Sequence, residues 1–251
     1  MDLGSTEERL VAVVEENARL KDELNRANAR ARSAREEFDA FVYAASHDLK
    51  QPLRSISSYA QLLVRMCGDN QDAIEYSGFI IDGVSVATTL IEQLLTFSRA
   101  GSSRHRVTTN VASVVQAAVF KLQPAIQKAG ATVSFRDLPE VSVNPTDFER
   151  VFENLIDNAI KYAGEEPIRV DISADDGDEG HIISVGDNGS GIQQKFHEQV
   201  FQPFKRLHGK NIPGSGLGLA MCRKIVEAQD GRIWVESDGK NGSVFKISLP
   251  Y

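Results

Sequence analysis

Cysteine is scarce in this chain of 251 residues, which contains only Cys67 and Cys222. Two cysteines so far apart match neither the disulfide framework of a small secreted domain nor the spacing of a zinc site, so we expect both thiols to be reduced and structural. The chain also lacks an uninterrupted apolar stretch approaching the roughly 20 residues that span a bilayer. Its charged N-terminus lacks the apolar core of a signal peptide. These absences predict a cytoplasmic segment without a membrane span, although a longer parent protein could carry an anchor.

Positive charge is in deficit, because 35 acidic residues outnumber 28 basic ones and the formal net charge is −7. A nucleic-acid-binding protein needs a concentrated basic face, so that class is not expected. The hydrophobic share of 41% and the charged share of 25% are ordinary for a soluble globular protein. The length allows one large domain or two smaller ones.

Glycine and proline are nearly absent from the first 45 residues, where Gly4 is the only glycine and no proline occurs. A seven-residue repeat of mostly apolar residues runs through this segment instead. Its positions are Leu10, Val13, Asn17, Leu20, Leu24, Ala27, Ala31, Ala34, Phe38, Phe41 and Ala45. The repeat is typical of a parallel two-stranded coiled coil, in which Asn17, the one polar residue of the seam, would fix the register. A solvated single helix is the alternative, and the regular seam favours a homodimer.

The next segment predicts a helical hairpin. In the heptad phase His47 faces solvent, and Pro52 is expected to bend the helix before it resumes as far as Met66. The cluster at 68–70 ends this helix, and a second amphipathic helix is expected over 72–98. Two such hairpins from two chains would make a four-helix bundle.

A polar linker at 100–105 precedes a region of alternating helical and strand patterns. Helices are expected over 111–128 (bent or broken near Pro124), 145–162 and 217–229, and strands over 131–135, 168–173, 181–185, 231–236 and 243–249. Asp175 and Asp176 are expected in a turn, and Trp234 and Phe245 in the core. This order predicts one layer of helices on one sheet. The expected domains are therefore a coiled coil (1–37), a dimerisation hairpin (38–103) and an α/β sandwich (104–251).

Two glycine-rich motifs point to phosphate chemistry. The run Gly214-Ser-Gly216-Leu217-Gly218 opens a helix, where glycine lets backbone amides approach an anion. It matches neither the dinucleotide pattern nor the P-loop. The second motif starts at Asp187 and resembles the start of a calcium loop, but Gly189 and Gly191 replace oxygen ligands there.

A polar helix face supplies the third element. Asn154, Asn158 and Lys161 recur at intervals of four and three and therefore share a face. Amide oxygens suit Mg²⁺ and an ammonium suits phosphate, so a metal-bound triphosphate is the ligand they favour. An ordinary solvated helix face is the alternative.

Five segments resemble, in order, the H, N, G1, F and G2 boxes of sensor histidine kinases. They are residues 46–53, 154–162, 187–191, 201–204 and 214–218. The resemblance covers roughly residues 36 to 250. It implies a dimeric four-helix bundle followed by an ATP-binding sandwich of the GHKL (Bergerat) type, which gyrase, heat-shock chaperone and mismatch-repair ATPases share. The implied activity is autophosphorylation from Mg-ATP, with transfer to an aspartate on the receiver domain of a response regulator supplied in trans.

The resemblance makes His47 the phosphoacceptor and the adjacent Asp48 its base. Gln51 replaces the Thr or Asn with which many relatives position a water for phosphatase activity, so that activity is left open. The segment from Lys205 to Ile212 is implied as a basic lid over the phosphates, and Arg206 is expected to stabilise the γ-phosphate.

The nucleotide site is implied by the remaining boxes. Asn158 is expected to bind Mg²⁺ with support from Asn154, while Lys161 and Tyr162 contact the nucleotide and Asp187 accepts the adenine amino group. Close backbone access is implied for Gly189, Gly191, Gly214, Gly216, Leu217 and Gly218.

Two other functions remain as alternatives. A GHKL ATPase acting as a conformational clamp needs no His47-Asp48 pair. An inactive nucleotide-binding scaffold is disfavoured by the presence of Asn158, Asp187 and the expected glycines. The sequence around His47 also resembles that of kinases attached to phytochrome-like or PAS sensors. This resemblance predicts an upstream sensor domain. Whether His47 is phosphorylated within one chain or across the dimer stays open.

Overall fold

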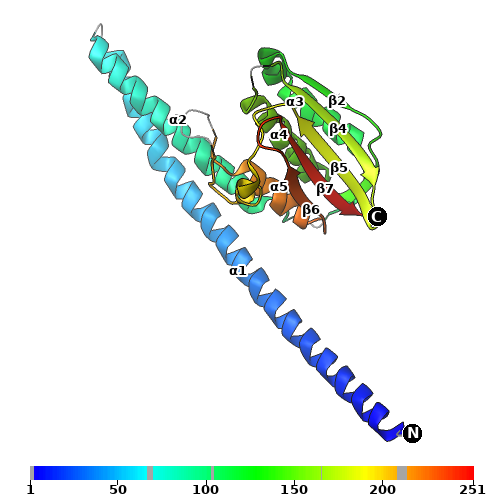
Figure 1. The fold of residues 1–251 in the computed structure, drawn as a ribbon. Coiled ribbons are helices and arrows are strands. Elements are labelled where there is room, and N and C mark those ends of the chain that lie inside the picture. Colours follow the sequence, from blue (N-terminus) through cyan, green and yellow to red (C-terminus); the bar gives the residue numbers. More distant parts are fainter. Residues whose placement is uncertain (1–2, 67–69, 103–104, 165, 208–213) are drawn as a thin grey trace. The chain divides into compact units, whose positions relative to one another are not determined.

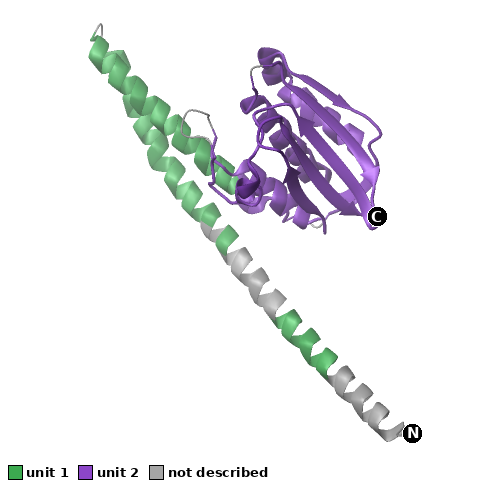
Figure 2. Ribbon diagram, viewed as in Figure 1, with its two compact units in different colours: residues 1–95 green, residues 96–251 purple. Residues whose placement is uncertain are grey.

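The computed structural model describes residues 3–66, 70–102, 105–164, 166–207 and 214–251. The side chains of residues 3–15, 27–37, 40 and 41 lie outside the described set. The chain divides into two compact units, residues 1–95 and 96–251, which are described separately below (Figure 2).

Unit 1 consists of α1 (Leu3–Met66) and most of α2 (Gln71–Arg99), which form a helical hairpin (Figure 1). α1 continues through Pro52 without the interruption expected from the sequence. A single proline removes one backbone hydrogen bond, and the long flanking helical runs keep the rest. An ion pair of 3.0 Å between Lys50 and Glu92 links the two helices. The expected break at 68–70 falls mainly on residues outside the described set, as does Cys67.

Four described side chains of the heptad seam, Asn17, Leu20, Leu24 and Phe38, are exposed in the single chain, and Ala45 is half-buried. Leu20, Leu24 and Phe38 are each more than half exposed. Exposed apolar residues in a regular stripe are a surface that a partner helix would cover. The coiled coil and the four-helix bundle therefore stay predictions.

α2 is the one described helix that is long and apolar enough to cross a membrane by length and composition alone. A count of uninterrupted apolar residues misses it because Asp82 and Glu92 interrupt its middle. The same apolar side chains are what a helix in a bundle would present to its partners.

Unit 2 contains a five-stranded mixed sheet (Figure 1). Its strands, in spatial order, are β2 (Thr132–Phe135), β4 (Arg169–Asp176), β5 (Gly180–Asp187), β7 (Ser243–Pro250) and β6 (Arg232–Glu236). β2 is parallel to β4, and the other neighbours are antiparallel.

Three helices cover one face of this sheet (Figure 1). They are α3 (Val111–Ala129), α4 (Pro145–Lys161) and α5 (Gly218–Glu227). Between them and the sheet lies an apolar core, in which Ile183 pairs across the strands with Ile247 and Phe152 packs edge-on against Phe148 at 5.2 Å. The predicted layer of helices on a sheet is thus confirmed.

Several elements differ from the sequence expectation. α3 is unbroken at Pro124. The strands β1 (Val107–Asn110) and β3 (Glu140–Val143), which pair with each other, were not predicted, and neither were the short 3-10 helices Gln194–Phe196 and Gln199–Phe201.

Two placements of single residues were wrong. Asp175 and Asp176 belong to β4 and not to a turn, because the β4–β5 ladder extends to the Asp176–His181 pair. Phe245 is buried as expected, but Trp234 is only half-buried and its indole nitrogen donates to Glu236 Oε1 at 3.0 Å.

The start of α4 follows the prediction. The Asn144 side chain accepts a hydrogen bond from the Asp147 amide at 3.0 Å, and Pro145 occupies the first helical position. Asparagine satisfies a donor that the first turn leaves open, and proline loses no bond there. This helix start places Asn154 and Asn158 further along α4.

Candidate functional site

A pocket lies in unit 2 where α4, the end of β5, the start of β7 and the start of α5 meet. Its wall includes five residues predicted to bind a nucleotide or its phosphates besides Gly191: Asn158, Tyr162, Asp187, Lys205 and Arg206. Residues from distant motifs of the sequence therefore line one cavity.

Asp187 ends β5 at the edge of the pocket. Its Oδ1 accepts hydrogen bonds from the amides of Gly189 at 2.8 Å and Ser243 at 3.3 Å. Burial raises the pKa of the Asp187 carboxyl, and these two bonds oppose that rise. The two amides therefore orient a carboxylate that its surroundings solvate poorly.

In both glycine-rich motifs, most glycines are required because the protein's own atoms leave no room for a side chain. A Cβ at Gly189 would lie 2.6 Å from the Tyr162 carbonyl oxygen, and one at Gly191, whose φ is +73°, would lie 2.6 Å from the Lys240 amide. Close contact with the chain's own backbone, rather than access for a ligand, already requires glycine at both positions.

In the other glycine motif, residues 214–218, the protein's own packing again accounts for most of the glycines. A Cβ at Gly218 would lie 2.7 Å from Asn154 Oδ1, and Gly216 has a φ of +75° and lies against the backbone of Phe204. Leu217 is buried directly before α5. Gly214 is the exception, because no described residue lies within 4 Å of a Cβ there.

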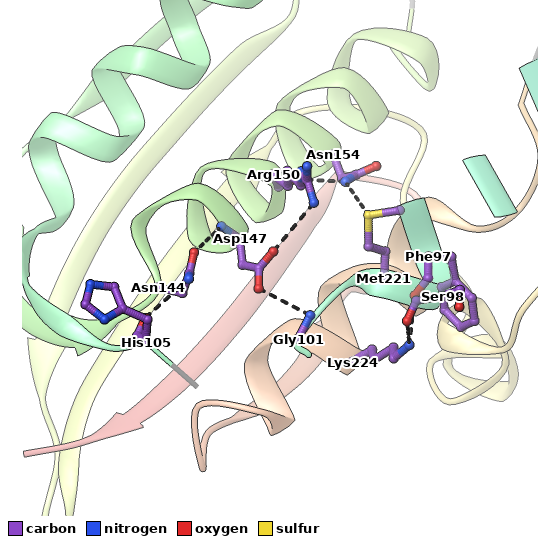
Figure 3. Close-up of polar contacts among 10 residues, drawn as sticks. All are labelled: Phe97, Ser98, Gly101, His105, Asn144, Asp147, Arg150, Asn154, Met221 and Lys224. Carbon is purple, nitrogen blue, oxygen red and sulfur yellow. Dashed lines mark hydrogen bonds and ion pairs between the residues drawn. The ribbon is translucent and has the colours of Figure 1, made fainter. Parts of the chain in front are cut away.

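The predicted polar face of α4 only partly reaches the pocket. Asn158 lines it, whereas Lys161 forms an ion pair with Asp157 and does not line it. The Asn154 amide donates to the Arg150 carbonyl at 2.7 Å and lies 4.0 Å from Met221 Sδ (Figure 3). Asn154 therefore supports the contact between α4 and α5 and does not itself line the cavity.

The root of the predicted lid is described, and the rest of it is not. Lys205 and Arg206 line the pocket, while residues 208–213 lie outside the described set. Phe201 is buried at this root, but Phe204 is exposed and has a φ of +62°. Of the two phenylalanines in the segment 201–204, only Phe201 packs into the core.

Apolar residues that were not predicted as site residues complete the pocket. These are Ala159, Ile192, Val200, Leu207, Leu219 and Phe245. Two polar residues, Ser190 and Ser243, were also missed. The available signal was their position next to the motifs, since Ser190 and Ile192 flank Gly191.

The predicted phosphoacceptor lies in unit 1. His47 and Asp48 are exposed side chains of α1, with His47 Nδ1 3.3 Å from Asp48 Oδ1. Gln51 is also exposed, one turn further along. An accessible neutral imidazole beside a carboxylate can act as a nucleophile through the ring nitrogen that the carboxylate does not contact.

Two protein families match the sequence. Residues 39–103 match the His Kinase A (phospho-acceptor) domain. Residues 143–251 match the family of histidine kinase-, DNA gyrase B- and HSP90-like ATPases. The first match contains His47 and the second contains every described residue that lines the pocket.

Two curated relatives indicate the range of lengths. The chain is 37% identical to the phytochrome-like protein Cph1 of Synechocystis sp., over 94% of this chain and 31% of Cph1. It is 32% identical to the adaptive-response sensory kinase SasA of Synechococcus sp., over 98% of this chain and 67% of SasA. The chain thus spans about a third of the phytochrome relatives, at 31%, 30% and 31% of their lengths.

Solved structures share the fold. Full-length ShkA in complex with AMPPNP has a TM-score of 0.65 at 21% identity, covering 83% of this chain and 45% of ShkA. Histidine kinase ThkA in complex with the response regulator TrrA has a TM-score of 0.57 at 23% identity, covering 82% of this chain and 60% of ThkA.

Proposed function

The chain belongs to the sensor histidine kinases, and from this we propose that it phosphorylates its own His47 from Mg-ATP and passes the phosphoryl group to an aspartate of a response regulator. Its class is protein-histidine kinase, and its C-terminal family binds ATP. The proposal rests on two features of the same chain. Unit 1 carries an exposed His47–Asp48 dyad, and unit 2 contains a pocket that is lined by Asp187.

The adenine end of the nucleotide is proposed to bind at Asp187. Both backbone amides bond Oδ1, so Oδ2 is the oxygen that we expect to accept a hydrogen bond from the adenine amino group. Guanine presents a carbonyl oxygen at that place, which a carboxylate would repel. The apolar side chains of Ile192, Leu219 and Phe245 suit the faces of a purine.

The phosphate end is proposed to lie toward Lys205 and Arg206, whose positive charges suit a triphosphate. The residues present fit a Mg²⁺ ion that arrives with the nucleotide. Asn158 offers one amide oxygen at the pocket, and no cluster of three His, Cys, Asp or Glu is found among the described residues. Mg²⁺ is commonly held by one or two protein oxygens together with phosphates and waters, and when bound it neutralises phosphate charge.

The proposed chemical step uses the two nitrogens of His47 differently. Asp48 accepts the hydrogen on Nδ1, which leaves the lone pair on Nε2. Nε2 forms a bond to the γ-phosphorus while the bond from that phosphorus to the bridging oxygen of ADP breaks. The Nδ1 proton stays shared with Asp48, whose charge stabilises the cationic ring, and Arg206 is proposed to stabilise the γ-phosphoryl oxygens.

A homodimer is proposed because the hairpin exposes large apolar side chains on both helices. On α1 these include Tyr59, Leu62, Leu63 and Met66, and on α2 Tyr76, Phe79 and Ile80. Such stripes suit a four-helix bundle formed by two hairpins. The domain limits 1–37, 38–103 and 104–251 remain part of this proposal.

Further partners are proposed from the relatives. The ThkA structure contains a response regulator, which supports a receiver domain as the acceptor in trans. The much longer phytochrome relatives support a sensor domain upstream, and a cytoplasmic location is proposed with it. Gln51 is exposed near His47, so phosphatase activity toward the receiver remains a minor part of the proposal.

The decisive test is incubation of the full chain with γ-labelled ATP and Mg²⁺. We expect a label that is lost in acid and kept in alkali, as for phosphohistidine. His47→Gln should abolish it while the affinity for a fluorescent ATP analogue stays near the wild-type value. A wild-type chain that binds the analogue and takes no label would overturn the proposal.

A further inference from the structure

The last turn of α2 is part of unit 2, although the rest of this helix belongs to unit 1. Lys224 of α5 donates hydrogen bonds to the carbonyl oxygens of Phe97, at 2.9 Å, and Ser98 (Figure 3). The same ammonium lies 5.1 Å from the centroid of the Phe97 ring. An ammonium at exposed carbonyls of a helix C-terminus is favoured by both hydrogen bonding and the helix dipole.

The turn that follows α2 also contacts the helices of unit 2. The Gly101 amide donates to Asp147 Oδ2 at 3.2 Å, and Asp147 is itself 6% exposed and lies 3.6 Å from Arg150 (Figure 3). Gly101 has a φ of +67°, and a Cβ there would lie 2.8 Å from the Cβ of Ala228. The turn at this position therefore fits only glycine without strain.

The chain stays attached beyond this turn. The Asn144 side chain donates to the His105 carbonyl at 3.2 Å. Arg106 donates to Asp230 at 2.7 Å and to the Ala228 carbonyl at 2.6 Å. The connection is thus fixed at both ends of the segment 97–106, apart from residues 103 and 104, which lie outside the described set.

The residues that hold this segment lie on the helices that form the pocket. α5 carries Lys224 and also Leu219, which lines the cavity. α4 carries Asp147 at its start and Asn158, which lines the cavity, near its end. The same two helices, α4 and α5, therefore contact both the candidate nucleotide site and the end of the helix that continues into the His47 hairpin.

We propose that Lys224 is a positioning residue for phosphorylation of His47. Its ammonium holds the final carbonyls of α2 on α5, and so limits the motion of the nucleotide-binding helices relative to the end of α2. This role rests on the proposed function. Without it, the segment 96–106 would act as a longer flexible tether, and the effective concentration of the bound nucleotide at His47 would fall.

The test compares Lys224→Met with Lys224→Arg in the full chain. Methionine keeps the length and the apolar contact of the stem but donates nothing, whereas arginine keeps a charged donor. We expect Lys224→Met to lower kcat for autophosphorylation on the order of tenfold, with KM for ATP unchanged. Lys224→Arg should recover most of the rate. Hydrogen exchange in the peptide that contains residues 96–102 should become faster in Lys224→Met.

Lys246→Met is the matched control, because Lys246 is also partly buried and pairs with Glu236 at 2.8 Å, away from this segment. It should change neither kcat nor exchange at 96–102. If Lys224 merely stabilises unit 2, its substitution would lower the melting temperature without a selective decrease in kcat at constant KM. Should Lys224→Met fail to fold, Lys224→Gln, whose side chain is shorter and carries no charge, is judged by the same criteria.

The outcomes separate the two proposals. A wild-type chain without label would refute the proposed function. A labelled wild type whose Lys224→Met variant has an unchanged or higher kcat would refute the positioning role alone. So would a variant whose KM rises as its kcat falls, or a Lys224→Arg variant as slow as the methionine variant.

Discussion

Asp187 shows how one residue can serve binding at a cost in stability. Burial raises the pKa of its carboxyl, so the ionised form is less favourable in the folded chain than in the unfolded one. This cost is present at every pH above the raised folded pKa. It disappears as the pH falls below the unfolded pKa of about 3.9, where the carboxyl is protonated in both states.

Asp187→Asn should therefore raise the melting temperature of unit 2 at pH 7, by roughly 2–4 °C, and weaken binding of a fluorescent ATP analogue at least about tenfold. The Asn oxygen can still accept from the Gly189 and Ser243 amides, so the loop should stay in place. Fluorescence of Trp234, the single tryptophan, reports this melting. A variant that is less stable at pH 7, or that binds the analogue normally, would count against this role of Asp187.

The glycines of the last motif should differ in their tolerance of alanine. Gly218→Ala places a methyl 2.7 Å from Asn154 Oδ1, whereas Gly214→Ala meets no described residue within 4 Å. We expect the first variant to lose about 1–3 kcal/mol of unfolding free energy, as overpacked sites do, and the second to stay within about 0.5 kcal/mol of wild type. Urea denaturation followed by Trp234 fluorescence measures both. Equal losses would mean that the packing around Gly218 is misjudged.

At the residue level, the motifs predicted which side chains gather but not what each contacts. Asn158 and Asp187 line one pocket as expected. Lys161 instead pairs with Asp157, which lies four residues earlier on the same helix. A helical interval defines a face and cannot decide between a ligand and a neighbouring carboxylate of the same helix.

At the scale of elements, Pro124 in α3 is expected to lower the unfolding free energy. Pro124 lies within an unbroken helix, where it removes one backbone hydrogen bond and crowds the preceding turn. Pro124→Ala restores a donor for the Phe120 carbonyl but makes the unfolded chain freer. The net change should be a gain in unfolding free energy on the order of 1–2 kcal/mol.

The gain should appear in urea denaturation followed by Trp234 fluorescence. Gln123→Ala, at the exposed neighbouring position, is the control and should change stability by less than about 0.5 kcal/mol. A Pro124→Ala variant no more stable than this control would indicate that α3 tolerates the proline without cost.

Long periodic elements were predictable, and short ones were not. α4 was expected over 145–162 and is observed over Pro145–Lys161, with Asn144 as its cap. β1 and β3 each have only four residues, too few for an alternating pattern to be distinguished from a loop. Their pairing joins segments more than thirty residues apart (Val107 with Val143), a long-range contact that local patterns do not encode.

At the scale of the whole molecule, the exposed apolar faces of the hairpin predict a dimer. Phe79 on α2 is 64% exposed in the single chain. Phe79→Glu would bury an unpaired carboxylate in the proposed bundle, so it should weaken the dimer at least about tenfold in sedimentation experiments. Gln61→Glu adds the same charge at an exposed polar position of α1 and should leave the dimer intact. A wild-type chain that sediments as a monomer would contradict the proposed bundle.

The overall plan of a helical hairpin followed by a helix-covered sheet was predictable, because each part has its own local pattern. The sheet order was not, since β7 lies between β5 and β6 and β2 joins in parallel with β4. Such an order depends on which strands bury the same apolar face, and that is settled only in three dimensions.

The most direct test of a kinase that modifies itself is to locate the phosphoryl group. The chain is incubated with Mg-ATP, digested at neutral pH, and its peptides are sequenced by mass spectrometry under conditions that preserve phosphoramidates. We predict one modified site, His47, whose occupancy rises with ATP and vanishes in Asp187→Asn at low nucleotide concentration. Phosphate on a serine, threonine or another histidine, with His47 unmodified, would contradict the assignment.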